Sequence, residues 1–169
     1  MKKLLNRLVA IFSIFSLLLG FSSAQARVDG DTITLGAAVS LTGKYSTNGE
    51  HTKNGYNLAV KRINDMGGVK VGGKSYKFAV KYYDDESNSK RAAQLAERLI
   101  KQDGVKYMLG PYSSGLTKAM APVTEENKIP MVEANGASRS LFTKGYKYLF
   151  AVLSPVSYTH LTLPTKRIV

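Results

Sequence analysis

The sequence predicts an α/β fold in which an open parallel sheet carries helices on both faces. Three observations support this prediction: apolar segments of strand length alternate with segments of helical periodicity, turn-forming residues separate them, and the connections are long enough for crossovers. Consecutive parallel strands need such crossovers, and helices then cover the sheet. A chain of 169 residues is long enough for one such domain.

The first strand is followed directly by the first helix. Residues 32–39 are mostly apolar, as is typical of a strand that is covered on both faces. A loop rich in turn-forming residues is expected at 40–49. Apolar side chains between Tyr56 and Ile63 then follow the i, i+3, i+4, i+7 spacing of one helix face, and two glycines at 67–68 are expected to end that helix.

The second unit begins with a hairpin and then repeats the pattern. A short strand at 69–71 turns through two glycines into a longer strand at 76–83. Helical spacing returns between Ala92 and Leu99, and an apolar strand is expected at 105–109.

In the third unit, the apolar residues between Leu116 and Val123 have the spacing of one helix face. Pro122 is expected to bend or divide this helix, because proline has no N–H to donate. Further strands are predicted at 129–132 and 148–153. The recurrence indicates repeated strand–helix–strand units rather than a solenoid repeat.

Four loops beyond the carboxyl ends of the strands are candidate ligand-binding segments, because open parallel sheets bind ligands there. They are residues 40–49, 84–89, 110–115 and 133–140. The third loop contains Ser113-Ser114-Gly115 where a helix is expected to begin. Unpaired backbone N–H groups, two hydroxyls and the positive end of the helix dipole suit an anion such as a carboxylate.

The fourth loop contains Asn135-Gly136-Ala137-Ser138, in which glycine lets the backbone approach a ligand closely. Both loops also fit simpler roles. Ser113 or Ser114 can serve only as a helix N-cap, and Asn135-Gly136 can form only a turn. The residues alone leave these alternatives open.

Asp84-Asp85-Glu86 is an acidic run in the second candidate loop. Carboxylate oxygens suit a divalent cation, but an acidic loop before a helix also caps that helix and complements its dipole. A metal site needs several converging ligands, and the sequence has no second acidic cluster. We therefore predict no metal site and no cofactor.

Residues 1–26 are predicted to be a cleaved signal peptide. Basic residues precede an apolar run at 8–19, and Ala24-Gln25-Ala26 follows as a small-x-small cleavage site. The apolar run is short for a membrane span, so an uncleaved anchor helix is the weaker alternative. Cleavage after Ala26 predicts a mature protein that begins at Arg27, does not span the membrane and lies in the periplasm.

The composition narrows the classes of function. The chain has 24 Lys and Arg residues against 12 Asp and Glu residues, a net charge of +12. The basic residues are dispersed, which favours a solvated surface over a nucleic-acid-binding stripe. The chain has no cysteine, which excludes disulfides, thiol catalysis and cysteine metal sites and leaves no residue for a lipid anchor.

Several short motifs occur in a fixed order between residues 31 and 155. They are Gly36-Ala37-Ala38-Val39-Ser40-Leu41-Thr42-Gly43, Asn54-Gly55, Ile63-Asn64-Asp65 with Gly67-Gly68, Tyr83-Asp84-Asp85, Gly110-Pro111 with Ser113-Ser114, and Ile129-Pro130-Met131. In this order and spacing they closely resemble the leucine/isoleucine/valine-binding proteins, which are type I periplasmic solute-binding proteins of ABC transporters.

The resemblance implies the first lobe of a two-lobed protein, whose lobes close on an amino acid by hinge motion and deliver it to a membrane permease. The loop that matches Ser113-Ser114 would give a hydroxyl to the ligand carboxylate. The loop that matches Asn135-Gly136-Ala137-Ser138 would give backbone and hydroxyl contacts. Many relatives have a threonine where this chain has Ala137, with Ser138 alongside.

Two further positions follow from the resemblance. Asn48 and Tyr112 match positions that line the side chain of the ligand. Because both are polar, they argue against a strictly aliphatic specificity. The groups of the second lobe that usually hold the ammonium group fall outside this resemblance.

Residues 156–169 interrupt the resemblance directly after Pro155. They have no helical spacing and look like translated sequencing-library adapter, so the native lobe is expected to span 27–155 and to be truncated. A divergent natural C-terminus is the alternative. Recovering the parent gene from independent DNA separates the two, because family-like coding sequence after Pro155 would show the tail to be an artefact.

Two other classes of function fit parts of the sequence. A secreted serine hydrolase would pair Ser113 or Ser114 with His51 as base, but neither loop has the Gly-x-Ser-x-Gly elbow, and a lone exposed histidine is more often solvated. A ligand-binding sensor domain of a receptor can share the fold. We expect a transport binding protein with no catalytic residue, and not an enzyme.

Overall fold

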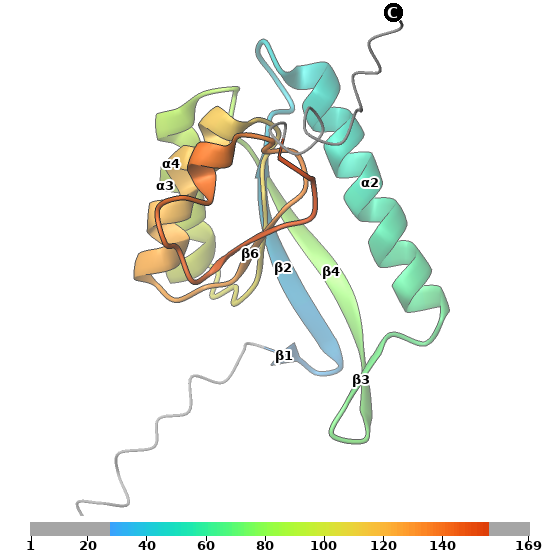
Figure 1. Cartoon of the computed structure of the whole chain (residues 1–169). Coiled ribbons are helices and arrows are strands. Elements are labelled where there is room, and N and C mark those ends of the chain that lie inside the picture. Colours follow the sequence, from blue (N-terminus) through green and yellow to red (C-terminus); the bar gives the residue numbers. More distant parts are fainter. Residues whose placement is uncertain (1–27, 156–169) are drawn as a thin grey trace, which may run out of the picture.

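A mostly parallel sheet runs through residues 28–155, the part of the chain that the computed structural model describes (Figure 1). Its strand order is β3-β4-β2-β5-β6-β7, and β1 pairs with β2. The strands are β1 (Val28–Asp29), β2 (Thr32–Val39), β3 (Val69–Val71), β4 (Lys74–Asp84), β5 (Met108–Leu109), β6 (Met131–Glu133) and β7 (Leu149–Ala151). The helices are α2 (Ser46–Asp65), α3 (Ser89–Lys101), α4 (Ser114–Glu126) and the 3-10 helix η1 (Arg139–Leu141).

β2 is the central strand of the sheet. It pairs in parallel with β4 along its whole length and with β5 at Gly36 and Ala37. β5 and β6, and then β6 and β7, are also parallel. These pairings confirm the predicted parallel sheet, and β2 has the bounds that the apolar run at 32–39 predicts.

Helices lie on both sides of the sheet, as predicted. Figure 1 shows α2 on one side of the strands and α3 with α4 on the other. α3 buries the residues of its predicted apolar face against the sheet and α4. The helix begins after Asn88, whose side chain accepts a hydrogen bond from the Arg91 N–H at 3.0 Å.

α2 begins earlier than the sequence predicts. The loop expected at 40–49 ends before Ser46, so Gly49 lies inside the helix. A Cβ added at Gly49 would lie 1.8 Å from the carbonyl oxygen of Ser40. Glycine therefore lets the first turns of α2 pack directly on the backbone at the carboxyl end of β2.

Pro122 does not divide α4, which runs without interruption from Ser114 to Glu126. Proline cannot donate a hydrogen bond to the carbonyl of Lys118. Both Lys118 and Pro122 lie on the exposed side of the helix, where water can bind that carbonyl.

The strands after α3 are shorter than predicted or are shifted, whereas β4 is longer than the strand predicted at 76–83. The strand predicted at 105–109 begins only at Met108, because the Val105 N–H donates to the Leu99 carbonyl at the end of α3. β6 ends at Glu133, one residue later than predicted, and the strand predicted at 148–153 is reduced to β7. β3 and β4 form the predicted hairpin through Gly72 and Gly73, both with positive φ.

The predicted signal peptide and the predicted adapter-derived tail lie outside the described residues. Within residues 28–155, no helix combines the length and apolar character that a membrane span requires.

Candidate functional site

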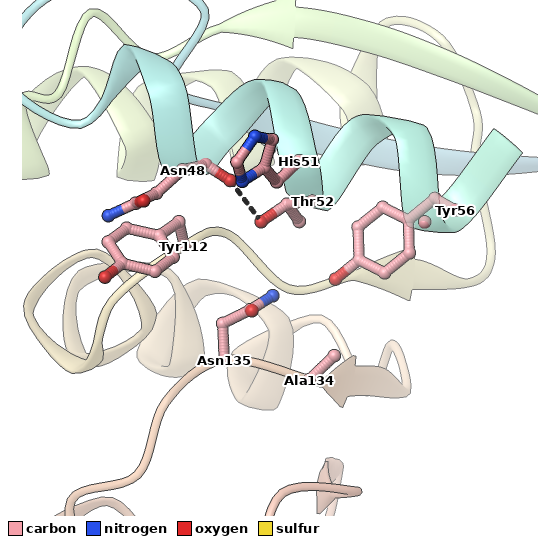
Figure 2. Close-up of a pocket in the computed structure, with 8 residues that line it drawn as sticks. Asn48, His51, Thr52, Tyr56, Tyr112, Ala134 and Asn135 are labelled. Atoms are coloured by element: carbon pink, nitrogen blue, oxygen red, sulfur yellow. Dashed lines mark hydrogen bonds between the residues drawn. The ribbon is translucent and has the colours of Figure 1, made fainter.

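A pocket of about 500 Å³ lies between α2 and the loops that follow β5 and β6 (Figure 2). This position is beyond the carboxyl ends of the parallel strands, where the fold predicts a ligand. Its lining residues come from three segments: Asn48, His51, Thr52, Gly55, Tyr56, Tyr112, Ala134 and Asn135.

The structure brings three of the predicted site residues together in this pocket. Asn48 comes from the first turn of α2, Tyr112 from the loop before α4, and Asn135 from the loop after β6. Figure 2 shows the Asn135 amide pointing from its loop toward α2. The other predicted residues do not line the pocket: Ser113, Ser114, Gly136, Ala137 and Ser138.

Those other residues form a junction of the two loops beside the N-terminus of α4. The Ser138 N–H donates a hydrogen bond to Ser114 Oγ at 3.1 Å. Because the Ser114 hydroxyl accepts this bond, its own hydrogen is available for a further acceptor. A hydroxyl hydrogen at the N-terminus of a helix suits a carboxylate oxygen.

Ser113 is the N-cap of α4, which was the simpler alternative for this residue. Its Oγ accepts a long hydrogen bond, 3.4 Å, from the Leu116 N–H. Its φ of 83° lies in a region that residues other than glycine rarely adopt. Such a conformation costs about 1–3 kcal/mol and is often found at functional sites.

Two of the pocket hydroxyls are already engaged within the protein. Thr52 Oγ1 donates to the Asn48 carbonyl at 2.9 Å, as Figure 2 shows, and the Tyr56 hydroxyl donates to the Gly110 carbonyl at 2.7 Å. Burial raises the pKa of the Tyr56 hydroxyl, with the Glu133 carboxyl adding to the shift. Tyr56 is therefore a neutral hydrogen-bond donor that ties α2 to the end of β5.

Four polar side chains of the pocket have no hydrogen-bond partner among the described residues. They are Asn48, His51, Tyr112 and Asn135. Together they supply both donors and acceptors to whatever occupies the pocket.

The sequence pattern does not reveal most of the α2 wall. It favours a solvated His51 and gives Thr52, Gly55 and Tyr56 no place in a site. Positions 48, 51, 52, 55 and 56 follow the i, i+3, i+4, i+7, i+8 pattern of one helix face. Placing the start of α2 at Ser46 would have revealed this face.

Glu133 lies beneath the loop of residues 134–138, and its side chain is fully buried. One carboxyl oxygen accepts the N–H groups of Asn135 and Gly136, and the other lies against Thr117 Oγ1. Burial raises the pKa of Glu133, although these hydrogen bonds act to lower it. Because both N–H groups point inward, they are engaged by the protein and not free for a ligand.

The acidic run at 84–86 holds the loop between β2 and α2. Asp84 accepts the N–H groups of Leu41 and Thr42 at 2.9 and 3.2 Å and the Thr42 hydroxyl at 2.7 Å. These bonds, with one from the Glu86 N–H, lower the pKa of Asp84 although burial acts to raise it.

Asp85 makes the second tie of that loop, accepting the Ser40 hydroxyl at 2.6 Å. Burial raises its pKa. The carboxylates of 84 and 85 therefore orient backbone and hydroxyl groups, and Asn88 provides the cap of α3. Within residues 28–155 there is no cluster of three or more acidic or histidine side chains placed to hold a metal ion.

The model of the periplasmic binding protein family matches residues 32–163. The chain belongs to this family. Among curated relatives, it is 31% identical over 136 residues to the Leu/Ile/Val-binding protein homolog 3 of Brucella melitensis, covering 80% of this chain and 34% of that protein. It is 28% identical over 153 residues to the leucine-, isoleucine-, valine-, threonine-, and alanine-binding protein of Pseudomonas aeruginosa, covering 90% of this chain and 39% of that one.

Solved structures give the same result. The substrate binding protein LivJ of Streptococcus pneumoniae, in complex with isoleucine, superposes with a TM-score of 0.66 at 30% identity, over 73% of this chain and 34% of that chain. A solute binding protein of an ABC transporter from R. palustris, in complex with 4-hydroxybenzoate, gives 0.62 at 31% identity, over 74% and 32%.

These comparisons confirm the type I periplasmic binding protein fold and the resemblance to the Leu/Ile/Val-binding proteins. The names of the relatives describe binding proteins and not enzymes, which contradicts the serine hydrolase alternative. The chain spans about a third of the length of the relatives it matches.

Proposed function

We propose that residues 27–155 are the first ligand-binding lobe of an extracytoplasmic solute-binding protein of an ABC importer. In this proposal the protein binds an amino acid between two lobes and delivers it to a membrane permease, without a cofactor or metal. The observation that supports it best is the pocket next to the Ser114–Ser138 junction, at the carboxyl ends of parallel strands. That arrangement offers one wall of a cleft.

The proposal includes export to the periplasm. It is supported by the basic start, the short apolar run and the small-x-small site of residues 1–26. N-terminal sequencing of periplasmic protein that starts at Arg27 would support this part, and recovery only from membranes would refute it.

The ligand carboxylate is proposed to bind at the junction of the two loops. Ser114 Oγ has a free hydrogen to donate, and the first N–H groups of α4 add the positive end of the helix dipole. Ser138 contributes its hydroxyl from the opposite loop, where it lies 2.9 Å from Ser140 Oγ. Ser113 shapes this end of the helix as its cap.

The rest of the ligand is proposed to reach into the pocket and to carry a hydrogen-bonding group. Covering the Asn48 and Asn135 amides with an aliphatic group would remove water without replacing its hydrogen bonds, at about 1–3 kcal/mol for each unpaired group. A polar amino acid or a small amide would pair with them instead. One relative was solved with isoleucine and another with 4-hydroxybenzoate, so the fold accepts both kinds of ligand.

Ser114→Ala tests the carboxylate site in the full-length protein encoded by the parent gene. We expect amino-acid affinity to fall by about 1–3 kcal/mol, the range for a hydrogen bond to a charged group, with little change in folding. Ser113→Ala is the matched control, because loss of an N-cap lowers stability without a selective loss of affinity. Equal affinities of wild type and Ser114→Ala would remove Ser114 from the site.

Asn48→Leu tests the polar pocket in the same protein. Calorimetric titration with leucine, isoleucine, valine and polar amino acids should show that the variant loses affinity for the polar ligand and gains relative affinity for aliphatic ones. Thr52→Val is the control, because the Thr52 hydroxyl is already bonded to the Asn48 carbonyl. A wild-type protein that prefers leucine over every polar amino acid would contradict this part of the proposal.

A further inference from the structure

We infer that Glu133 is a positioning residue: it joins the loop of residues 134–138 to the start of α4 through Thr117 and so fixes the spacing of the two loops that face the ligand. The inference rests on the proposed function, because its consequence for binding depends on those loops holding an amino acid. Glu133 itself does not touch the pocket or the proposed ligand.

The first half of the connection lies between Glu133 and the loop that follows it. The carboxyl is at the last position of β6 and has no exposed surface. One of its oxygens accepts the N–H groups of both Asn135 and Gly136. Two bonds to one oxygen curl the loop back over the end of the strand, as in an Asx-type turn built from a longer side chain.

The second half of the connection lies between Glu133 and α4. Thr117 Oγ1 is within hydrogen-bond distance of both the second Glu133 oxygen and the Ser113 carbonyl, the latter at 2.9 Å. A threonine hydroxyl has one hydrogen to donate, so it cannot donate to both acceptors.

If the Glu133 carboxyl is neutral, it supplies the second hydrogen that these two acceptors need. Its O–H then donates to Thr117 Oγ1, and the Thr117 hydroxyl donates to the Ser113 carbonyl. Every polar atom of the connection has a partner in this arrangement. The full burial of the carboxyl favours the same neutral form.

The carboxyl packs directly against the two loops. A Cβ added at Gly110 would lie 2.5 Å from Glu133 Oε2, and one added at Gly136 would lie 3.0 Å from Glu133 Cδ. Only glycine fits at these two positions without displacing the carboxyl. The loop after β5 and the loop after β6 therefore both take their shape against Glu133.

The connection ends at the residues proposed to bind the carboxylate. Thr117 holds the carbonyl of Ser113, whose positive φ needs support from its surroundings. Ser114 follows, and its Oγ accepts the Ser138 N–H of the other loop. The two loops are thus joined twice, once through the buried Glu133 carboxyl and once through the Ser114–Ser138 hydrogen bond.

The test uses variants of the full-length protein from the parent gene and measures amino-acid affinity together with thermal stability. Glu133→Ala and Thr117→Val should weaken binding at least ten-fold. Glu133→Gln should retain wild-type affinity, because glutamine can accept both N–H groups and donate an N–H to Thr117. Thr124→Val is the matched control: this buried threonine lies on the same helix but bonds the Ala121 carbonyl, away from the loops, so it should lower stability without changing affinity.

A measurement on the ligand-free protein tests the positioning role independently of the proposed function. In the ligand-free protein, amide hydrogen exchange at Asn135 and Gly136 should speed up at least ten-fold in Glu133→Ala and stay slow in Glu133→Gln, with the amides of β2 unchanged in both. If Glu133→Ala does not fold, Thr117→Val replaces it: a loss of affinity in Thr117→Val but not in Thr124→Val supports the positioning role, and equal affinities in the two variants overturn it.

Each outcome decides one of the two proposals. If the wild type binds no amino acid but exchange responds as expected, the proposed function is wrong and the positioning role stands. If the wild type binds and neither affinity nor exchange responds to Glu133→Ala, the positioning role is wrong. If Glu133→Gln loses as much affinity as Glu133→Ala, the neutral connection through Thr117 is wrong.

Discussion

The two faces of the sheet differ in how completely they are covered. On one face, α3 and α4 pack against the strands and each other, and the core there is closed around Leu99, Met108, Met120 and Met131, each at most 1% exposed. On the other face, α2 contacts mainly β2 and β4. The strands beyond β2 on that face have no covering helix among the described residues.

The alternation of side chains identifies which residues lie on the open face. Gly36 approaches Leu99 of α3, so Leu35 on the same strand points to the opposite side. An apolar groove of about 350 Å³ opens there, and its lining includes Ile33, Leu35, Val69, Val71, Phe78, Tyr107, Leu109 and Val132. Tyr107 and Val132 remain 42% and 38% exposed.

A strand can therefore be apolar on both sides and still be fully covered on only one. The apolar run of β2 predicts burial on two faces. The described residues supply that burial on the α3 side and supply only part of it on the α2 side. The pocket lies on this second, partly covered side, since α2 forms one of its walls.

The strongest loss is expected for amino-acid binding when only one wall of the ligand pocket is present. Purified residues 27–155 should bind amino acids no tighter than about 1 mM, because a ligand on one wall stays open to water and its hydrogen bonds then add little. Titration calorimetry with leucine, isoleucine, valine and polar amino acids measures this. Saturable one-site heats in the micromolar range would show that one lobe suffices.

The next contrast compares one apolar residue from each face. Leu99→Ala, on the closed face, should lower the free energy of unfolding by about 2–5 kcal/mol, because it leaves a cavity in a packed core. Val132→Ala, on the open face, should cost about 1 kcal/mol or less. Denaturant unfolding measures both. Equal losses would mean that the open face is packed as tightly as the closed one.

How far the sequence predicts this structure also differs between the two sides. The strand at 32–39 and the apolar face of α3 are predicted correctly, because continuous or periodic apolar residues reflect burial directly. The start of α2 is missed, because residues 46–50 are polar or glycine and carry no apolar period. The His51–Tyr56 wall of the pocket is missed with it.

Glu133 shows a second limit of prediction from sequence. A single acidic residue at the end of a short strand normally indicates a solvated position. Its burial depends on Gly110 and Thr117, which lie in a different segment of the chain, as well as on Gly136 nearby. Only the fold brings these partners together, so the pattern of residues could not have revealed the connection.

A smaller effect is expected for self-association through the open face. Residues 27–155 should associate, because an exposed apolar groove gains free energy when it is buried. Tyr107→Ser and Val132→Ser should each weaken this association by about 1–2 kcal/mol, measured by sedimentation equilibrium. Leu58→Ser is the control, because Leu58 is 68% exposed on α2 and lies outside the groove. Association that persists in the double variant would assign it to another surface.

The smallest expected effect is a pH dependence that separates two neighbours in β6, Val132 on the open face and Glu133 on the closed one. Burial raises the pKa of Glu133 above the ordinary value of 4.5, so the folded state binds this proton more tightly than the unfolded state does. The stability that this group contributes is then greatest at low pH and falls as the pH rises above 4.5.

Glu133→Gln cannot ionise and should lack this loss, so its free energy of unfolding should rise relative to wild type as the pH increases toward neutrality. Val132→Ala should follow the wild-type pH profile, and the shifts of Asp84 and Asp85 cancel because all three proteins share them. Denaturant unfolding at a series of pH values measures the difference, and parallel curves for wild type and Glu133→Gln would show that the carboxyl has the same affinity for its proton in both states.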